Sequence, residues 1–496
     1  MKQENRENKE NKKSEEVRLR FAPSPTGFLH IGNLRTALFG FLIAKSQGGK
    51  FILRIEDTDE KREVEGAVKS LLDILSWIGI EFDEGPEIGG DFGPYVQTQR
   101  LDIYKKHSDE LLDKGRAYRC FCSAERLEKM RADQTEAKLP PRYDRTCRDL
   151  NPEESLKRVE AGEKFVIRQK MPLSGEVKVF DELRGEITFQ AHDLDDQVLI
   201  KSNGVPTYQF ASVIDDYLMK ISHVTRGDEW LASFPKNILL YKAFNWKAPK
   251  FIHLPLLLNK DGGKLSKRQG DVFVEDYRAK GYIKEAIINF CALLGWHPQG
   301  NQEILSLEEL KNNFSISGLG SSPAVFDLEK LDFFNAYYLR QKSAKELIEL
   351  AKPYLTEASL PTEGEKLEKA FLIARDRLKK LSDVPEAIGF FFNRPETEKD
   401  LIVWKNNTLE TAKNNLTEIL DFISKIEDNS WTKENLEEEV LAWIKREKEG
   451  RNGDYLWPLR TVLSGLKNSP SPFEIAWVIG REESLKRIKK VINYEI

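Results

Sequence analysis

The N-terminal part of the chain combines two patterns of hydrophobic positions. Apolar side chains occupy every second position over residues 17–21, which predicts a short strand. Over residues 31–46 they recur at helical spacing ahead of two glycines that can end a helix, and residues 51–55 predict a second strand. Strand, loop, helix and strand form a βαβ unit, in which ligands bind at the carboxyl ends of the parallel strands. The sequence therefore places a site in the loop over residues 23–32 and directly after Ile55.

The pattern changes along the rest of the chain. Residues 95–221 are mixed, with strand-like runs such as residues 165–169, and we interpret them as an insertion into the nucleotide-binding fold. Beyond about Arg340 the pattern is helical, and one apolar stripe lies between charged residues. Its members are Leu367, Phe371, Ala374, Leu378 and Leu381. The C-terminal third is predicted to be an all-α domain.

Length and composition indicate a folded enzyme of several domains. A chain of 496 residues exceeds what one core usually supports, and its 40% hydrophobic and 32% charged residues allow a large core under an ionised surface. Residues 1–16 carry five basic and five acidic side chains with almost nothing apolar, which predicts a disordered tail. The apolar stretch over residues 37–44 is too short to span a bilayer, so we expect no membrane role.

Charge and cysteine content narrow the choice of partners and compartment. The formal net charge is −4, so the chain lacks the overall basicity that would indicate nucleic-acid binding, and any such contact must use local basic patches. Four cysteines are too few for a disulfide framework. They favour free thiols or metal ligands in a reducing compartment, and we expect a cytoplasmic protein.

The first motif that carries chemistry is Pro-Ser-Pro-Thr-Gly-Phe-Leu-His-Ile-Gly-Asn, over residues 23–33. Proline and glycine shape a tight loop, and the helix start offers unpaired N–H groups and a positive dipole end to a phosphate group. His30 can donate a hydrogen bond to phosphate oxygens, and Gly32 lets a nucleotide lie against the backbone. A histidine taken alone is more often structural, but this setting favours a phosphate contact.

The second motif is Asp-Gly-Gly-Lys-Leu-Ser-Lys-Arg, over residues 261–268. A glycine turn followed by cations suits a segment that folds over a triphosphate and neutralises charge as pyrophosphate leaves. Without the first motif, the same residues would be interpreted as an ordinary basic surface loop.

Together the two motifs resemble the His-Ile-Gly-His and Lys-Met-Ser-Lys-Ser signatures of class I aminoacyl-tRNA synthetases. Asn33 stands where the first signature has its second histidine. The segments 20–27, 54–59 and 226–230 are similar to those of bacterial glutamyl-tRNA synthetases, and the similarity runs from about Arg18 to Ile492. The resemblance implies an ATP-dependent ligase that forms glutamyl-adenylate and transfers glutamate to the 3′ end of tRNA(Glu).

The resemblance also implies roles for individual residues. His30, Lys264 and Lys267 would be catalytic. ATP would be bound by Thr26, Gly27, His30, Gly32, Asn33, Lys264, Ser266 and Lys267. Glutamate would be bound by Arg20, Ala22, Ser24, Glu56, Tyr208, Ser212, Arg226 and Trp230. The arginines suit the carboxylates of glutamate, and Glu56 suits its ammonium group.

In the implied mechanism, the α-carboxylate of glutamate attacks the α-phosphorus of ATP in line, and no side-chain nucleophile is required. Positioning and charge stabilisation would do most of the catalysis, with Mg²⁺ bridging the phosphates. The partners implied are tRNA(Glu), L-glutamate and ATP, and the residues are also compatible with the charging of tRNA(Gln). The family expectation is a monomer.

The cysteine cluster allows two interpretations. Cys120, Cys122, Cys147 and Asp149 could form a tetrahedral Zn²⁺ site of three thiolates and one carboxylate. Relatives that bind zinc here carry a histidine in place of Asp149, so three free thiols are the equal alternative.

We therefore expect an α/β fold with a Rossmann-type class I catalytic domain, an inserted acceptor-stem-binding domain and an all-α anticodon-binding domain. The expected bounds are 1–16 for the tail, 17–94 and 222–270 for the catalytic domain, 95–221 for the insert, 271–340 for a stem-contact region, and 341–496 for the anticodon-binding domain.

Four other functions agree less well with the sequence. Glutaminyl-tRNA synthetases share the nucleotide fold but end in β-barrels, and the shorter enzymes that glutamylate a modified tRNA base lack so large a C-terminal domain. An inactive paralogue that binds tRNA would be expected to lose His30, Lys264 or Lys267, and all three are present. A generic ATP-using enzyme would leave the C-terminal helices without a purpose.

Overall fold

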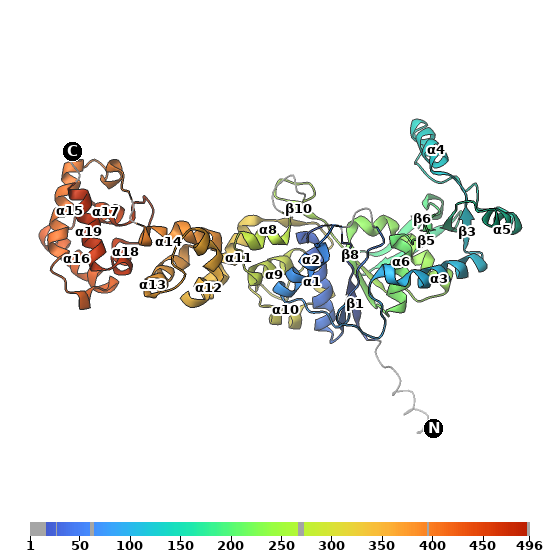
Figure 1. Ribbon diagram of the computed structural model, residues 1–496, viewed down its shortest axis with the longest axis horizontal. Coiled ribbons are helices and arrows are strands. Elements are labelled where there is room, and N and C mark those ends of the chain that lie inside the picture. The colour runs from blue at the N-terminus through green and yellow to red at the C-terminus, as the bar shows by residue number, and fades with distance from the viewer. Residues whose placement is uncertain (1–15, 26, 60–63, 266–271, 394–395, 494–496) are drawn as a thin grey trace, which may run out of the picture. The chain divides into compact units, whose positions relative to one another are not determined.

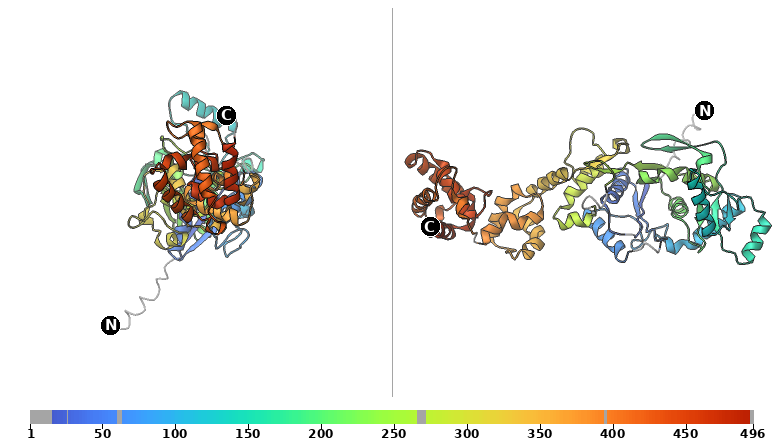
Figure 2. Two further views of the ribbon diagram at one scale, coloured as in Figure 1. Left: turned by 90° about the vertical axis from the view of Figure 1, so that its left-hand side faces the viewer. Right: turned by 90° about the horizontal axis from the view of Figure 1, so that it is seen from above.

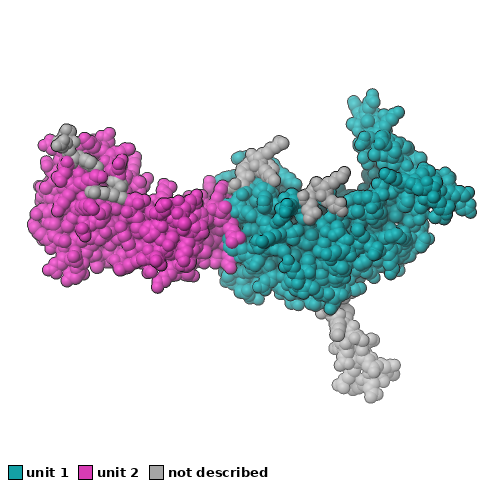
Figure 3. Space-filling model, in the orientation of Figure 1, with its two compact units in different colours: residues 1–276, 287–327 teal, residues 277–286, 328–496 magenta. Residues whose placement is uncertain are grey.

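A computed structural model describes residues 16–25, 27–59, 64–265, 272–393 and 396–493. The chain divides into two compact units (Figures 1 and 3). Unit 1 comprises Met1–Asp276 and Ile287–Asp327, and unit 2 comprises Tyr277–Ala286 and Leu328–Ile496. Of the predicted N-terminal tail, only Glu16 lies within the described residues.

A parallel sheet forms the centre of unit 1. Strand β1 (Arg18–Phe21) pairs in parallel with β2 (Lys50–Leu53), and β8 (His223–Gly227) pairs in parallel with β9 (Lys250–Leu254). The two pairs lie side by side, because the backbone N–H of Ser222, just before β8, donates to the carbonyl of Arg18 at 2.9 Å. The two pairs belong to separate hydrogen-bonded ladders, and this contact brings together strands that are about 200 residues apart in the sequence.

The predicted βαβ unit is confirmed. Helix α1 (Ile31–Ser46) connects β1 to β2, and eleven of its sixteen residues are buried. It is apolar almost all round because it packs against β1, β2 and β8, and also against α10 (Leu307–Asn313). The second strand ends at Leu53 rather than Ile55, although the N–H of Arg54 still donates to the carbonyl of Phe21 at 3.0 Å.

The segment between the two strand pairs of the sheet adds two further pieces of β-structure. Strands β3 (Ala117–Cys120), β4 (Val166–Gln169) and β7 (Val198–Ile200) form an antiparallel sheet, and β4 confirms the strand expected over residues 165–169. A hairpin of β5 (Glu176–Asp181) and β6 (Gly185–Gln190) joins the central sheet, because β5 pairs in parallel with β9 at Asp181 and Phe251. Part of residues 95–221 therefore extends the central sheet.

The remaining elements of unit 1 surround these sheets. Strands β10 (Leu257–Asn259) and β11 (Ala324–Phe326) pair in parallel. The other helices are α2 (Ala67–Ile78), α3 (Leu101–Asp113), α4 (Ala124–Glu136), α5 (Pro152–Glu160), α6 (Tyr208–Leu218) and α7 (Phe234–Phe244). Helices α8 (Val274–Ala279) and α9 (Lys284–Leu293) each run across a boundary between the units.

Unit 2 is helical, as predicted: the regular elements among its described residues are all helices (Figures 1 and 2). Its helices are α11 (Leu328–Gln341), α12 (Ala344–Glu357), α13 (Glu365–Ala374), α14 (Val384–Phe392), α15 (Leu409–Ile423), α16 (Lys433–Glu447), α17 (Asn452–Ser464), α18 (Pro472–Ile479) and α19 (Arg481–Ile492). The predicted apolar stripe is buried, but α13 ends at Ala374; beyond it, Leu378 follows one short 3-10 helix and Leu381 begins the next. No helix among the described residues has the length and apolar character needed to cross a bilayer.

Candidate active site

A row of polar side chains crosses the central sheet of unit 1 near the carboxyl ends of its strands. Arg20, Arg226 and His253 each lie one residue before the end of their strands, β1, β8 and β9. Arg226 and His253 are direct partners in the register of β8 and β9, and Asp181 ends the neighbouring strand β5. All four side chains are at most 6% exposed. Charged groups buried at this edge of a parallel sheet indicate a ligand site.

Arg226 is a buried cation that forms no direct ion pair with any carboxylate of the described residues. Its Nε donates to Nε2 of His253 at 2.9 Å, and its guanidinium lies 5.1 Å from the ring centre of Phe251 and 5.9 Å from that of Phe234. Burial lowers the pKa of Arg226 from its usual value. Within the described part of the chain its Nη2 has no hydrogen-bond partner. A guanidinium in this state is suited to an anionic ligand.

Arg20 belongs to a buried ion network. Its Nε donates to Oδ1 of Asp216 at 2.9 Å, and the same oxygen accepts from Nη1 of Arg54 at 2.7 Å. Nη2 of Arg54 in turn donates to Oε1 of Glu56 at 2.9 Å. Arg54 is 0% exposed, so these contacts are shielded from water. The network fixes Arg20 and Glu56 relative to each other.

Glu56 follows β2 and is the acidic group of this network. Its Oε1 also accepts from Nε2 of Gln97 at 3.4 Å, whereas Oε2 is buried and, among the described residues, has no partner. Burial raises the pKa of Glu56 to about 7, against the opposing effect of Arg54 and Arg20. A carboxylate with an unfilled acceptor position is suited to an ammonium group.

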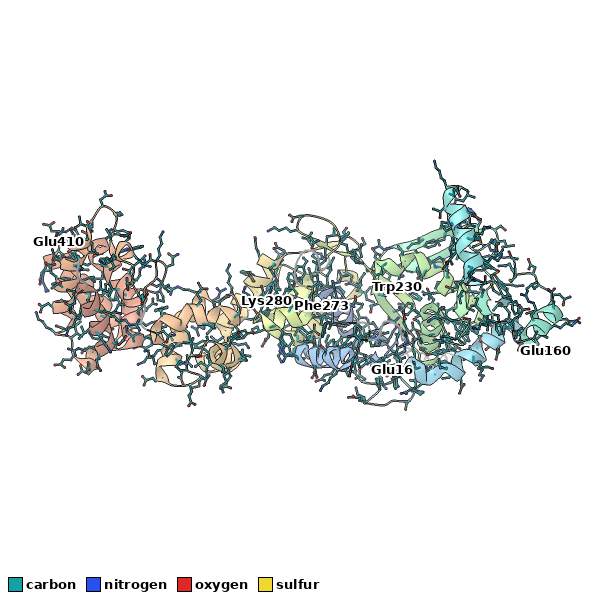
Figure 4. All side chains as sticks on the ribbon, turned by 45° about the horizontal axis from the view of Figure 1, so that its top comes forward. Glu16, Glu160, Trp230, Phe273, Lys280 and Glu410 are labelled. Carbon is teal, nitrogen blue, oxygen red and sulfur yellow. The ribbon has the colours of Figure 1, made fainter. Side chains whose placement is uncertain are left out.

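Helix α6 covers this network with one face. Tyr208, Ser212, Asp215 and Asp216 recur at helical spacing, and the last three are buried. The ring of Tyr208 lies 4.5 Å from that of Trp230, which is labelled in Figure 4. Burial raises the pKa of Tyr208 to about 12, so its hydroxyl stays neutral and can donate. Six of the eight predicted glutamate-binding residues thus lie on the sheet, directly after its strands or on α6: Arg20, Arg226, Glu56, Tyr208, Ser212 and Trp230.

The first motif forms the start of α1. His30 is the N-cap of this helix, and its Nδ1 accepts from the N–H of Gly32 at 3.0 Å. A neutral ring bonded in this way carries its proton on Nε2, a donor of the kind that phosphate accepts. A Cβ on Gly32 would lie 3.3 Å from Nδ1 of His30, which accounts for the glycine. Ala22 and Gly27 are half-buried in this loop, and Ser24 and Asn33 are exposed.

The segment after the second motif pairs with the first. The N–H of Ile31 donates to the carbonyl of Val272 at 2.8 Å, and the N–H of Val274 donates to the carbonyl of Leu29 at 3.0 Å. Phe273, between them, is labelled in Figure 4. Lys264 is exposed after the glycine turn that follows β10. Thr26, Ser266 and Lys267 lie outside the described residues.

The predicted zinc ligands do not all come together. The thiols of Cys120, Cys122 and Cys147 lie within 4.8 Å of one another. Asp149 is exposed and is not part of this group. The hydroxyl of Tyr143 lies 3.2 Å from Sγ of Cys120 and 3.5 Å from Sγ of Cys122, and it accepts from the N–H of Cys147 at 3.0 Å. The structure places Tyr143, not Asp149, beside the three thiols.

Four residues of the site were not predicted from the sequence: Arg54, Asp216, His253 and Asp181. Each is polar and buried within a segment that is otherwise apolar or at the end of a strand. A polar residue inside a buried strand, such as His253 between Ile252 and Leu254, is the signal that could have identified them.

Comparison with known proteins gives a consistent result over both units. Residues 16–333 match the family described as the catalytic domain of class I tRNA synthetases for glutamate and glutamine. Residues 346–492 match the family described as an anticodon-binding domain.

Relatives match over nearly the whole chain. A glutamate–tRNA ligase of Clostridium botulinum is 46% identical over 479 residues, which cover 96% of this chain and 98% of the relative. One from Finegoldia magna is 44% identical over 96% of this chain and 99% of its own length. The crystal structure of a glutamate tRNA ligase from Elizabethkingia meningosepticum, in complex with its amino acid, superposes with a TM-score of 0.90 at 37% identity. It covers 97% of this chain and 100% of that one.

Proposed function

This chain belongs to the family of class I tRNA synthetases for glutamate and glutamine, and we propose that it is a glutamate–tRNA ligase. It uses ATP to convert glutamate to glutamyl-adenylate and pyrophosphate, and it transfers the glutamyl group to the 3′-terminal adenosine of tRNA(Glu). The match of residues 346–492 to an anticodon-binding domain supports tRNA as the acceptor.

One observation carries the choice of glutamate. Arg226 is buried beside the ion network and contacts a neutral histidine rather than a carboxylate. A substrate side-chain carboxylate would offset this charge, whereas the amide of glutamine would leave it uncompensated. Arg20 is the second guanidinium of the site, and Glu56 offers Oε2 to the ammonium group. The charges of the site therefore complement the two carboxylates and the ammonium group of glutamate.

In this proposal, the residues of the first and second motifs bind the phosphates of ATP and stabilise their negative charge. The α-carboxylate of glutamate attacks the α-phosphorus of ATP, the bond to the bridging oxygen breaks, and pyrophosphate leaves. His30 donates from Nε2 to a phosphate oxygen, and the start of α1 favours the same negative charge. Lys264 and Lys267 neutralise charge on the leaving group. Mg²⁺, which enters bound to ATP, would supply further positive charge.

A structural Zn²⁺ is proposed for the thiol cluster. In a tetrahedral thiolate site, Zn–S bonds of about 2.3 Å separate the sulfurs by about 3.8 Å. Sγ of Cys122 and Sγ of Cys147 are 3.6 Å apart, so the spacing fits. Cys120 would be the third ligand, and the hydroxyl of Tyr143 stands at the fourth position. The local core holds only four buried residues, so a metal would stabilise a segment that has little core of its own.

The remaining expectations concern the setting of the reaction. We propose a monomer that works in the cytoplasm, where tRNA charging supplies translation. The cysteines at positions 120, 122, 147 and 291 form no disulfide, which agrees with a reducing compartment. Charging of tRNA(Gln) by the same site is compatible with this proposal, because the amino-acid pocket does not read the anticodon.

The test is aminoacylation with radiolabelled glutamate and ATP in three parallel reactions, with tRNA(Glu), with tRNA(Gln) and without tRNA. We expect charging of tRNA(Glu), no charging with radiolabelled glutamine, and loss of charging in Arg226→Ala and Lys267→Ala. The tRNA(Gln) reaction measures how broad the tRNA specificity is. Binding of tRNA(Glu) without any charging would contradict the proposal and favour a regulatory tRNA-binding protein.

A further inference from the structure

His253 can hold only one protonation state in the arrangement that the structure shows. Nε of an arginine always carries a hydrogen, so Nε2 of His253 must be the acceptor in its 2.9 Å contact with Arg226. The proton of the neutral ring therefore sits on Nδ1. Nδ1 lies 2.8 Å from Oδ2 of Asp181 and donates to it. A second proton on the ring would sit on Nε2, where its N–H would face the N–H of Arg226 Nε.

Asp181 is itself held in place by four hydrogen bonds. Oδ2 also accepts from the backbone N–H of His253 at 3.0 Å. Oδ1 accepts from the N–H groups of Leu183 at 3.0 Å and Arg184 at 3.1 Å, in the turn between β5 and β6. Asp181 and His253 are both 0% exposed. The orientation of the imidazole is therefore set by the backbone around it and by Asp181.

The arrangement leaves the charge of Arg226 available. A carboxylate in direct contact, such as the contact of Asp216 with Arg20, would offset part of the guanidinium charge that an anionic substrate requires. A neutral imidazole accepts one hydrogen bond, fixes the plane of the guanidinium through Nε, and leaves Nη2 without a partner within the described residues. The contact with Asp181 makes Nε2 a stronger acceptor, as a carboxylate does for a metal-bound histidine.

We infer that Asp181 and His253 are positioning residues for Arg226: together they orient its guanidinium toward the side-chain carboxylate of the substrate without neutralising it. The inference rests on the proposed glutamate-binding role of Arg226. It also links the inserted segment to the amino-acid pocket, because Asp181 lies on the hairpin that the insert adds to the central sheet.

The first test is the Michaelis constant (KM) for glutamate in aminoacylation of tRNA(Glu) by the full-length enzyme. Asp181→Asn replaces one oxygen with an NH₂ group, and either orientation of the amide sets this group against two N–H donors. We expect KM for glutamate to rise at least tenfold and KM for ATP to stay within twofold. His253→Leu should behave in the same way, whereas His253→Gln, whose amide oxygen can accept from Arg226, should raise KM for glutamate by less than threefold.

A matched control separates positioning from general damage to the fold. Asp196 is another fully buried carboxylate in the inserted segment, where it accepts from Arg148 and Tyr118. Asp196→Asn should lower the melting temperature but leave KM for glutamate within twofold. Equal rises in KM for glutamate and ATP in Asp181→Asn, or no rise in either, would overturn the inference.

A double-mutant cycle tests whether Asp181 acts through Arg226. Arg226→Lys keeps a cation but lacks the Nε donor, so adding Asp181→Asn should change KM for glutamate by less than twofold. If the double variant instead raised KM for glutamate by the product of the two single effects, Asp181 would act independently of Arg226, and the inference would be overturned.

A spectroscopic measurement tests the protonation state of His253 without relying on activity. In protein labelled with ¹⁵N-histidine, Nε2 of His253 should give the resonance of an unprotonated nitrogen, and Asp181→Asn should shift it. A protonated Nε2 in the unaltered protein would contradict the positioning role. Failure to charge tRNA(Glu) together with an unprotonated Nε2 would instead refute the proposed function alone.

Discussion

The backbone N–H of Gly32 donates to Nδ1 of His30 at 3.0 Å, so the histidine caps the helix that begins after it. This bond fixes the tautomer that presents an N–H from Nε2. Since that group and the helix start both favour an anion, we expect His30→Ala to lower kcat by roughly 10²–10³-fold with little change in KM for glutamate. Steady-state aminoacylation of tRNA(Glu) measures both constants.

His30→Asn separates capping from phosphate binding. Asparagine is among the preferred N-cap residues and can accept from Gly32, so the loss of about 1 kcal/mol expected for alanine should not occur. The melting temperature of His30→Asn should match that of the unaltered protein while its kcat is as low as that of His30→Ala. A fully active His30→Asn would mean that the histidine serves only the helix.

The raised pKa of Glu56 predicts that kcat/KM for glutamate falls as the pH is lowered. Burial raises its pKa to about 7 from a usual value of 4.5, so the group becomes protonated and neutral as the pH falls through 7. Because only the ionised form can balance an ammonium group, kcat/KM for glutamate should be constant above pH 7 and approach a tenfold loss per unit below it. Pyrophosphate exchange in the presence of tRNA(Glu) between pH 5.5 and 8.5 measures this. Glu56→Gln should give a low and pH-independent value, and an unchanged slope in this variant would assign the titration to another group.

We expect that the substitution of Arg54 causes a large loss of stability. Its guanidinium is 0% exposed and contacts Asp216 at 2.7 Å and Glu56 at 2.9 Å. Arg54→Met would leave Glu56 buried without its cation and Asp216 with Arg20 alone, at an expected cost of about 3–5 kcal/mol in the free energy of unfolding. Thermal unfolding followed by circular dichroism should show the loss. Lys105→Ala removes an exposed pair with Asp109 in the same unit and should cost less than about 1 kcal/mol. Similar losses in the two variants would contradict a buried network.

The thiol cluster predicts the metal content of the protein. We expect one Zn²⁺ per chain by inductively coupled plasma mass spectrometry, with loss of the metal in Cys122→Ser or Cys147→Ser. Because Tyr143 lies beside the thiols and Asp149 does not, Tyr143→Phe should weaken zinc retention against a chelator by about 10–100-fold, and Asp149→Ala should not. If Asp149→Ala weakened zinc retention and Tyr143→Phe did not, Asp149 would be the fourth ligand instead.

Arg487 is a structural residue of unit 2, although it lies in a basic stretch at the C-terminus. It is 2% exposed and donates to the carbonyls of Phe390 at 2.8 Å and Leu463 at 2.6 Å. Arg487→Ala would leave buried carbonyls unpaired at roughly 1–3 kcal/mol each, so the melting temperature of unit 2 should fall by several degrees. Lys490 is exposed, and Lys490→Ala should leave that temperature unchanged while it weakens tRNA binding. A stable Arg487→Ala with weak tRNA binding would reverse these roles.

The sequence by itself determined the βαβ start of the fold and the helical C-terminal part. Both follow from local patterns, such as the alternation of apolar and charged side chains over residues 17–21 and the mostly apolar run over residues 31–46 that ends before two glycines. The same holds for His30 and Gly32, because a helix start and its cap are set by neighbouring residues. The resemblance of motifs added Arg20, Glu56, Tyr208 and Arg226, but not the contacts between them.

Only the tertiary structure decided how those residues are held. Arg20 meets Asp216 because α6 lies over the sheet, and Arg226 meets His253 because β8 and β9 pair side by side. No local pattern encodes a pairing across 196 or 27 positions. The fourth position beside the thiols was decided in the same way. Spacing along the chain suggested Asp149, whereas the turn that carries Cys147 brings Tyr143 back onto the sulfurs and leaves Asp149 in water. Long-range contacts of this kind depend on the path of the whole chain, because burial makes a polar side chain bond to whichever group the fold brings within reach.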